Sequence, residues 1–106
     1  MSVNVSPKVI SGLRAIAEKY AIGKIVVFGS RARGDNNSKS DIDIAIYPMT
    51  PITEFENKGH FISEVDDLDT LLKIDIIFVN NNTDEKLIAN IQKEGVVIYE
   101  RLLAEA

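Results

Sequence analysis

Residues 25–46, with the sequence IVVFGSRARGDNNSKSDIDIAI, hold the features that decide the fold. The apolar run IVVF predicts a buried strand that stops at a glycine and a serine. A polar loop follows, and residues 41–46 predict a second strand. Side chains alternate along a strand, so Asp41 and Asp43 share one face, and Ile42, Ile44 and Ile46 share the other. Two carboxylates therefore stand side by side where a strand begins.

The carboxylate pair predicts a metal site. Asp41 and Asp43 repel each other unless a cation lies between their oxygens, and Mg²⁺ prefers oxygen ligands of this kind. Across the loop, Gly29 allows a tight turn and a close approach to a ligand, and Ser30 offers a hydroxyl where residues 30–33 predict a turn or short helix. Exposed backbone N–H groups at such a point suit a phosphate.

Length and composition indicate one soluble globular domain, which we expect to span residues 1–106. The sequence is 45% hydrophobic and 26% charged, as in ordinary globular proteins. It has no apolar run near the roughly 20 residues that a membrane helix needs, and no signal-peptide pattern at its start. Its lack of cysteine excludes disulfides and thiolate metal sites. We therefore expect a cytoplasmic protein without membrane contact.

The net charge of −4 at pH 7 argues against direct binding of a nucleic acid, because proteins that bind one electrostatically are usually basic. A small nucleotide is compatible with this charge. Mg²⁺ and local cations such as Arg31 and Arg33 can neutralise its phosphates.

The rest of the chain predicts helices and strands that enclose these two strands. Ser6 and Pro7 predict the start of a helix. We expect this helix to end near Gly23 and to cover one face of a sheet. Its apolar stripe consists of Ile10, Leu13, Ala17 and Tyr20. The second strand is expected to end at Pro48.

A capping-box pattern at residues 53–56 predicts a second long helix, whose shared apolar face would hold Phe55, Ile62, Val65 and Leu72. Gly59 weakens this helix, and the single histidine, His60, is expected on its exposed side. Residues 74–79 predict a third strand. Asn82 is expected to cap a last helix that ends at Gly95, and residues 96–99 predict an edge strand. The fold class is therefore α/β (α+β), a small twisted mixed sheet of three to four strands with packed helices.

Asp75 is the second residue of the predicted third strand, where burial of a charge is costly unless the charge is paired or bound to a cation. This position makes Asp75 a candidate for the site. The alternative is a buried acid paired with Lys73 or with an arginine. Arg31 and Arg33 likewise have an alternative interpretation, as an ordinary solvated surface.

The motif Gly29-Ser30-x-Ala32-Arg33-Gly34, followed after six residues by Asp41-x-Asp43, resembles the signature of the DNA polymerase β-like nucleotidyltransferase superfamily. The sequence GSRARG, followed by SDIDI, is most similar to that of the MNT (minimal nucleotidyltransferase) members of this superfamily. The resemblance implies a fold like the polymerase β palm. It also implies adenylyl transfer from ATP, with release of pyrophosphate, at a site with two Mg²⁺ ions.

The resemblance also assigns roles to residues. Asp41, Asp43 and Asp75 would be the catalytic residues and the metal ligands, and Asp75 would accept the proton of the attacking hydroxyl. Gly29 and Ser30 would bind the triphosphate of the nucleotide. Arg33, with Arg31 as a second candidate, would contact its β- and γ-phosphates.

MNT proteins are commonly paired with an all-helical HEPN protein, so the resemblance implies a protein adenylyltransferase antitoxin that modifies and neutralises a HEPN ribonuclease toxin. Two other hypotheses stay open. The chain could be a non-catalytic module that blocks its partner by complex formation, or a nucleotidyltransferase that acts on a small molecule such as an aminoglycoside. The larger superfamily members carry an additional helical domain, for which we expect no room in 106 residues, so a partner chain or a second copy could complete the site.

Overall fold

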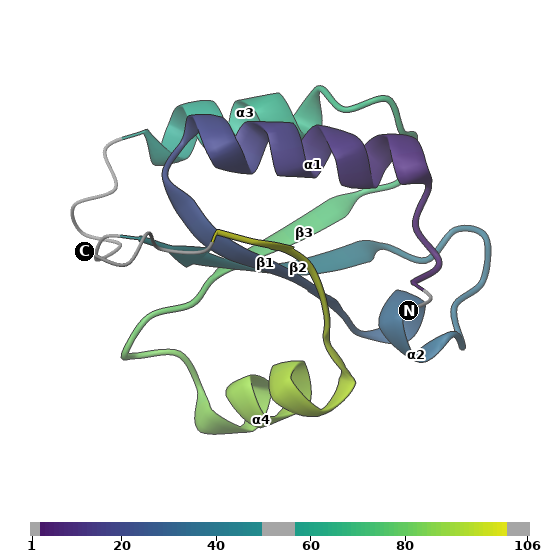
Figure 1. Cartoon of the computed structure of the whole chain (residues 1–106). Helices are drawn as coiled ribbons and strands as arrows, with labels where there is room; N and C mark the ends of the chain where they lie inside the picture. The colour runs from purple at the N-terminus through teal and green to yellow at the C-terminus, as the bar shows by residue number, and fades with distance from the viewer. Residues whose placement is uncertain (1–2, 50–56, 102–106) are drawn as a thin grey trace.

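A four-stranded mixed sheet with strand order β3-β2-β1-β4 forms the centre of the protein in the computed structural model, which describes residues 3–49 and 57–101 (Figure 1). The strands are β1 (Ile22–Phe28), β2 (Ile42–Pro48), β3 (Ile74–Phe78) and β4 (Val96–Glu100). β1 pairs antiparallel with β2 and with β4, whereas β2 and β3 are parallel. The predicted fold class and the edge position of the last strand are confirmed.

Helices lie on both faces of the sheet. The four helices of the described residues are α1 (Pro7–Lys19), α2 (Ser30–Arg33), α3 (Lys58–Asp66) and α4 (Glu85–Glu94). Figure 1 shows α1 and α3 side by side over one face and α4 alone over the other, with the short α2 near the end of β1. None of the described helices has the length and apolar character needed to cross a membrane.

The larger part of the core lies under α1. This helix begins as predicted, with the Ser6 hydroxyl accepting a hydrogen bond from the backbone N–H of Lys8 at 3.3 Å. Of the predicted stripe, Leu13 and Ala17 are fully buried, while the other two members are only partly buried. The stripe is instead completed by Val9 and Ile16.

The predicted end of α1 near Gly23 is wrong. The helix ends at Lys19 because Ala21 adopts φ 55°, a left-handed conformation that turns the chain, and Ile22 already begins β1. Gly23 therefore lies within a strand.

Two further helix predictions need correction. The side chain of Asp84, not that of Asn82, caps α4 by accepting a hydrogen bond from the N–H of Leu87 at 3.2 Å. α3 ends at Asp66, so Leu72 lies in the segment after the helix. The predicted capping box at residues 53–56, including Phe55, lies outside the described residues. α4 ends at Glu94, with the predicted Gly95 as its C-cap.

A polar cluster joins the end of α1 to α3. The hydroxyl of Tyr20 donates a hydrogen bond to Glu64, and the ammonium of Lys19 lies 2.9 Å from the same carboxylate oxygen. These contacts, the Tyr20 bond first, hold the pKa of Glu64 below its ordinary value, and the charge of His60 acts in the same direction. Beneath them the ring of Tyr20 packs edge-on against Phe61. The cluster therefore fixes two helices of one layer together.

A carboxyl whose pKa is lowered by folding stabilises the protein above its ordinary pKa, here 4.5, and that contribution is lost as the pH falls through the lower folded value. We expect Glu64→Gln to lower the melting temperature at pH 7 and to have a progressively smaller effect below about pH 4.5. Thermal unfolding of both proteins between pH 3 and pH 7 measures this. Glu18→Gln, an exposed site on α1, is the control. A pH-independent difference for Glu64→Gln would contradict the account.

Candidate active site

The pairing of three strands brings the predicted carboxylates to one end of the sheet. Phe28, the last residue of β1, pairs with Asp43 of β2, and Asp43 pairs with Asp75 of β3. Asp41 comes directly before β2. Residues two positions on from these aspartates, Ala45 and Ile77, pack in the smaller core cluster with Ile91 of α4. All three carboxylates therefore belong to the face of the sheet that α4 partly covers.

The electrostatics of the site centre on Asp43. Burial raises the pKa of the Asp43 carboxyl above its ordinary value, and the negative charges of Asp75 and then Asp41 raise it further, while Arg33 opposes them. No described residue forms an ion pair with Asp41 or Asp43. The folded protein thus concentrates negative charge around a half-buried acid that no cation of the described chain contacts.

Gly29 lies directly against Asp43. Its φ of +76° is a left-handed conformation, and a Cβ atom built on it would lie 2.5 Å from Oδ2 of Asp43. Only glycine combines that backbone turn with that approach. The sequence predicted the turn, and the structure adds that the space at Gly29 is needed by the central carboxylate.

Asp75 forms an ion pair with Lys73, whose Nζ lies 3.3 Å from Oδ1 of Asp75. The Asp75 side chain is 36% exposed, so it is not the deeply buried acid of the alternative interpretation. The pairing and the catalytic role do not exclude each other. A catalytic role for Asp75 remains a prediction.

The chemistry of Asp41, Asp43 and Asp75 suits a hard divalent cation. Carboxylates supply the oxygen ligands that Mg²⁺ prefers, and a bound cation would relieve the repulsion among their negative charges. In residues 3–49 and 57–101, however, no three His, Cys, Asp or Glu side chains come close enough together to hold one metal ion. The chemistry of the predicted metal site therefore fits, and its geometry stays a prediction.

Arg31 has a different role from the predicted ones. Its side chain is buried, at 6% exposed, and its guanidinium donates to four backbone carbonyls. The closest are Asn4 at 2.7 Å and Ser40 at 3.0 Å, with Asn37 and Ser38 both at 3.4 Å. A guanidinium buried in this way neither contacts the phosphates of a nucleotide nor belongs to a solvated surface, so both predictions for Arg31 are wrong.

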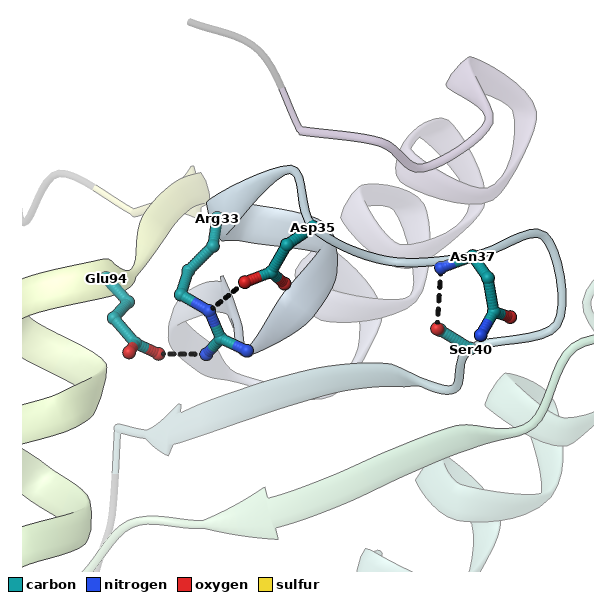
Figure 2. Close-up of polar contacts among 5 residues, drawn as sticks. All are labelled: Arg33, Asp35, Asn37, Ser40 and Glu94. Carbon is teal, nitrogen blue, oxygen red and sulfur yellow. Dashed lines mark hydrogen bonds and ion pairs between the residues drawn. The ribbon is translucent and has the colours of Figure 1, made fainter.

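The consequence of this buried guanidinium is a fixed loop before Asp41. Three of its four acceptors belong to residues 37–40, and the N–H of Asn37 also donates to the hydroxyl of Ser40 at 3.0 Å (Figure 2). Sequence reasoning missed this function. A signal was available, since an arginine beside a loop rich in Asn and Ser can satisfy several loop carbonyls at once.

Arg33 is a cation whose charge acts on Asp43. Its Nε donates to Asp35 at 3.0 Å and its Nη1 donates to Glu94 of α4 at 2.9 Å (Figure 2). These two bonds raise the pKa of Arg33, with Asp35 the larger cause. The Arg33 side chain is 43% exposed, so a ligand can reach it.

Ser30, the first residue of α2, is half-buried, and His60 is exposed on α3 as predicted.

Residues 12–102 match the family model described as polymerase beta, nucleotidyltransferase. The chain belongs to this nucleotidyltransferase family. The predicted resemblance is confirmed at this level, and the enzyme is a nucleotidyltransferase. A candidate protein adenylyltransferase of Methanocaldococcus jannaschii is 36% identical over 81 residues, which are 71% of this chain and 83% of the relative.

Solved structures resemble this nucleotidyltransferase in fold. A toxin–antitoxin crystal structure with AMP-PNP aligns with a TM-score of 0.62 at 18% identity, over 87% of this chain and 73% of the other. A complex of a tri-AMPylated HEPN toxin of Shewanella oneidensis with its MNT antitoxin gives a TM-score of 0.56 at 16% identity, over 88% and 71%. A candidate nucleotidyltransferase of Sulfolobus solfataricus gives 0.50 at 26% identity, over 89% and 85%.

The contact between Gly29 and Asp43 can be tested with two alanine substitutions. Gly29 and Gly34 both have positive φ, but a Cβ at Gly34 would meet no atom within 4 Å. We expect Gly34→Ala to lower the free energy of unfolding by about 1–2 kcal/mol, the cost of the backbone conformation alone. Gly29→Ala should cost more, because its φ of 76° and ψ of −156° are open essentially only to glycine and because the new Cβ displaces Asp43, and it should abolish nucleotide binding. Urea denaturation and calorimetric titration with ATP measure both effects. Equal losses for the two variants would show that the contact has no role.

Proposed function

We propose that this nucleotidyltransferase transfers AMP from ATP to a hydroxyl of a HEPN ribonuclease toxin in the cytoplasm, and so neutralises the toxin. The candidate protein adenylyltransferase relative, at 36% identity, supports a protein acceptor. Fold neighbours described as toxin–antitoxin complexes, one with AMP-PNP and one with an AMPylated HEPN toxin, support the partner class.

The observation that carries the proposal is that two further carboxylates act on Asp43, which itself lies against Gly29. Asp43 is half-buried and lies beside the turn that ends β1, and the charges of Asp75 and Asp41 act on it. Such a group is unfavourable for stability, because each charge disfavours the others. Catalytic sites commonly hold groups of this kind. A purely structural role offers no comparable reason for them.

Charge balance argues for divalent cations as partners of the nucleotide. Among the described residues, the contacts and charge effects of this region join five carboxylates to two cations, namely Asp35, Asp41, Asp43, Asp75 and Glu94 to Arg33 and Lys73. A triphosphate would be repelled by this excess of negative charge. Mg²⁺ ions held by Asp41, Asp43 and Asp75 would remove the repulsion and stabilise the charge that develops on the phosphate oxygens.

The residues of this chain would position the reaction as follows. The turn at Gly29 and Ser30 binds the phosphates, and Arg33 contacts the β- and γ-phosphates. The acceptor oxygen, from a hydroxyl of the partner, attacks the α-phosphorus and forms the new P–O bond. The bond from the α-phosphorus to the oxygen of the leaving pyrophosphate breaks, and Asp75 takes the proton of the hydroxyl. The protein contributes mainly orientation and charge.

The proposal predicts that Asp43→Asn abolishes transfer and does not weaken the fold. Asp43 has a raised pKa, so its charged form costs stability as the pH rises past its ordinary value of 3.8. Removal of that charge should therefore leave the free energy of unfolding at pH 7 unchanged or higher. The intact mass of a HEPN partner, after incubation with ATP and Mg²⁺, measures the transfer.

A mass gain of one or more AMP units with the wild type and none with Asp43→Asn is the expected result. Glu85→Gln, an exposed acid on α4, is the matched control and should leave the gain intact. A stable complex without a mass gain would favour a non-catalytic blocking module. AMP on an aminoglycoside but not on the protein would favour a small-molecule acceptor.

A further inference from the structure

Glu94 is the last residue of α4, and it reaches the site through Arg33. Its Oε1 accepts a hydrogen bond from Nη1 of Arg33 at 2.9 Å, across 61 positions of sequence. Figure 2 shows the two side chains meeting between the end of α4 and α2, with Asp35 on the other side of the guanidinium. One cation of the candidate site is thus held by two carboxylates from different parts of the chain.

The position of Glu94 is unfavourable for α4 itself. The carboxyl end of a helix carries partial negative charge, so an acid there is repelled, and a cation would be preferred. Neutralisation of Arg33 does not need it either, because Asp35 already supplies a carboxylate 3.0 Å from Nε. A residue that violates a local rule in this way commonly serves the site to which it points.

Of the two carboxylates that bind Arg33, Glu94 is the less exposed to solvent. Its side chain is 22% exposed, against 61% for Asp35. The next residue, Gly95, packs so closely that a Cβ there would lie 2.4 Å from Cγ1 of Val26 in β1. The end of α4 is therefore fixed to the central strand that leads to Gly29.

The third nitrogen of Arg33, Nη2, makes no hydrogen bond or ion pair with any residue of the described ranges. In Figure 2 it points away from Glu94. A guanidinium has five N–H donors, so two bonds to carboxylates leave donors for a phosphate. The charge of Arg33 also acts on Asp43 and opposes the rise of its pKa, so the guanidinium is coupled electrostatically to the carboxylates of the site.

We propose that Glu94 is a positioning residue that, with Asp35, holds the guanidinium of Arg33 so that Nη2 faces the phosphates of the nucleotide. The inference rests on the proposed function, which it extends by giving α4 a part in nucleotide binding. Held in this way, Arg33 loses less freedom when the nucleotide arrives, and binding is tighter. The opposite arrangement, in which Glu94 competes with the phosphates for Arg33, predicts weaker binding in its presence.

The test compares ATP affinity in the presence of Mg²⁺ with the mobility of Arg33. Calorimetry gives the affinity for the wild type, Glu94→Ala, Glu94→Gln and Arg33→Ala, for the double variant, and for Glu85→Ala as the control at the other end of α4. Relaxation of the ¹⁵Nε–H signal of Arg33 reports its mobility without nucleotide. We expect Glu94→Ala to mobilise Arg33 and to weaken ATP binding about threefold to tenfold. Glu94→Gln, which keeps an acceptor oxygen, should be intermediate.

In the Arg33→Ala background, Glu94→Ala should have no further effect on ATP binding, because the two residues act as one unit. An unchanged Arg33 signal, tighter ATP binding, or an equal effect of Glu94→Ala with and without Arg33 would each overturn the inference and leave the proposed function intact. If the wild type binds no ATP with Mg²⁺, the proposed function and this inference both fail.

Discussion

The antiparallel pairing of β1 with β2 is the constraint on which the site depends. It sets Phe28 opposite Asp43, and the glycine that follows Phe28 then lies against the carboxylate of Asp43. A shift of one residue in this register would turn Asp43 toward the core under α1 and expose the isoleucines of β2. The full burial of Ile42, Ile44 and Ile46 therefore fixes the register and, through it, the place of the acid.

The same arrangement shows how stability and function are divided within the fold. The core under α1 and α3 is apolar and closely packed, with Leu13, Ile25 and Phe61 all fully buried. The face under α4 holds the smaller cluster and the charges around Asp43. Repulsion among these charges lowers the free energy of unfolding, and the burial of the larger core offsets this loss, since stability is a sum over the whole domain. In our account a cation and a nucleotide complete this face.

The sequence was sufficient for the features that depend on local patterns. Alternation in residues 41–46 predicted the shared face of Asp41 and Asp43, and a charge in an apolar strand pattern made Asp75 a candidate, which the pairing of β2 with β3 then sets opposite Asp43. Predictions failed where tertiary contacts decide. The left-handed Ala21 that ends α1 early has no strong signal, and the role of Arg31 depends on carbonyls from Asn4 and a loop. The contact of Arg33 with Glu94 joins residues 61 positions apart, and no local pattern predicts it.

A divalent cation at the carboxylates is the central claim of the account, and titration of the ¹⁵N-labelled protein with Mn²⁺ tests it most directly. This paramagnetic ion broadens the amide signals of residues near it. The account predicts selective broadening at Gly29, Asp43 and Asp75, abolished by Asp43→Asn and reversed by excess Mg²⁺. Broadening centred on the acidic residues 64–69, or a pattern that Asp43→Asn leaves unchanged, would contradict it.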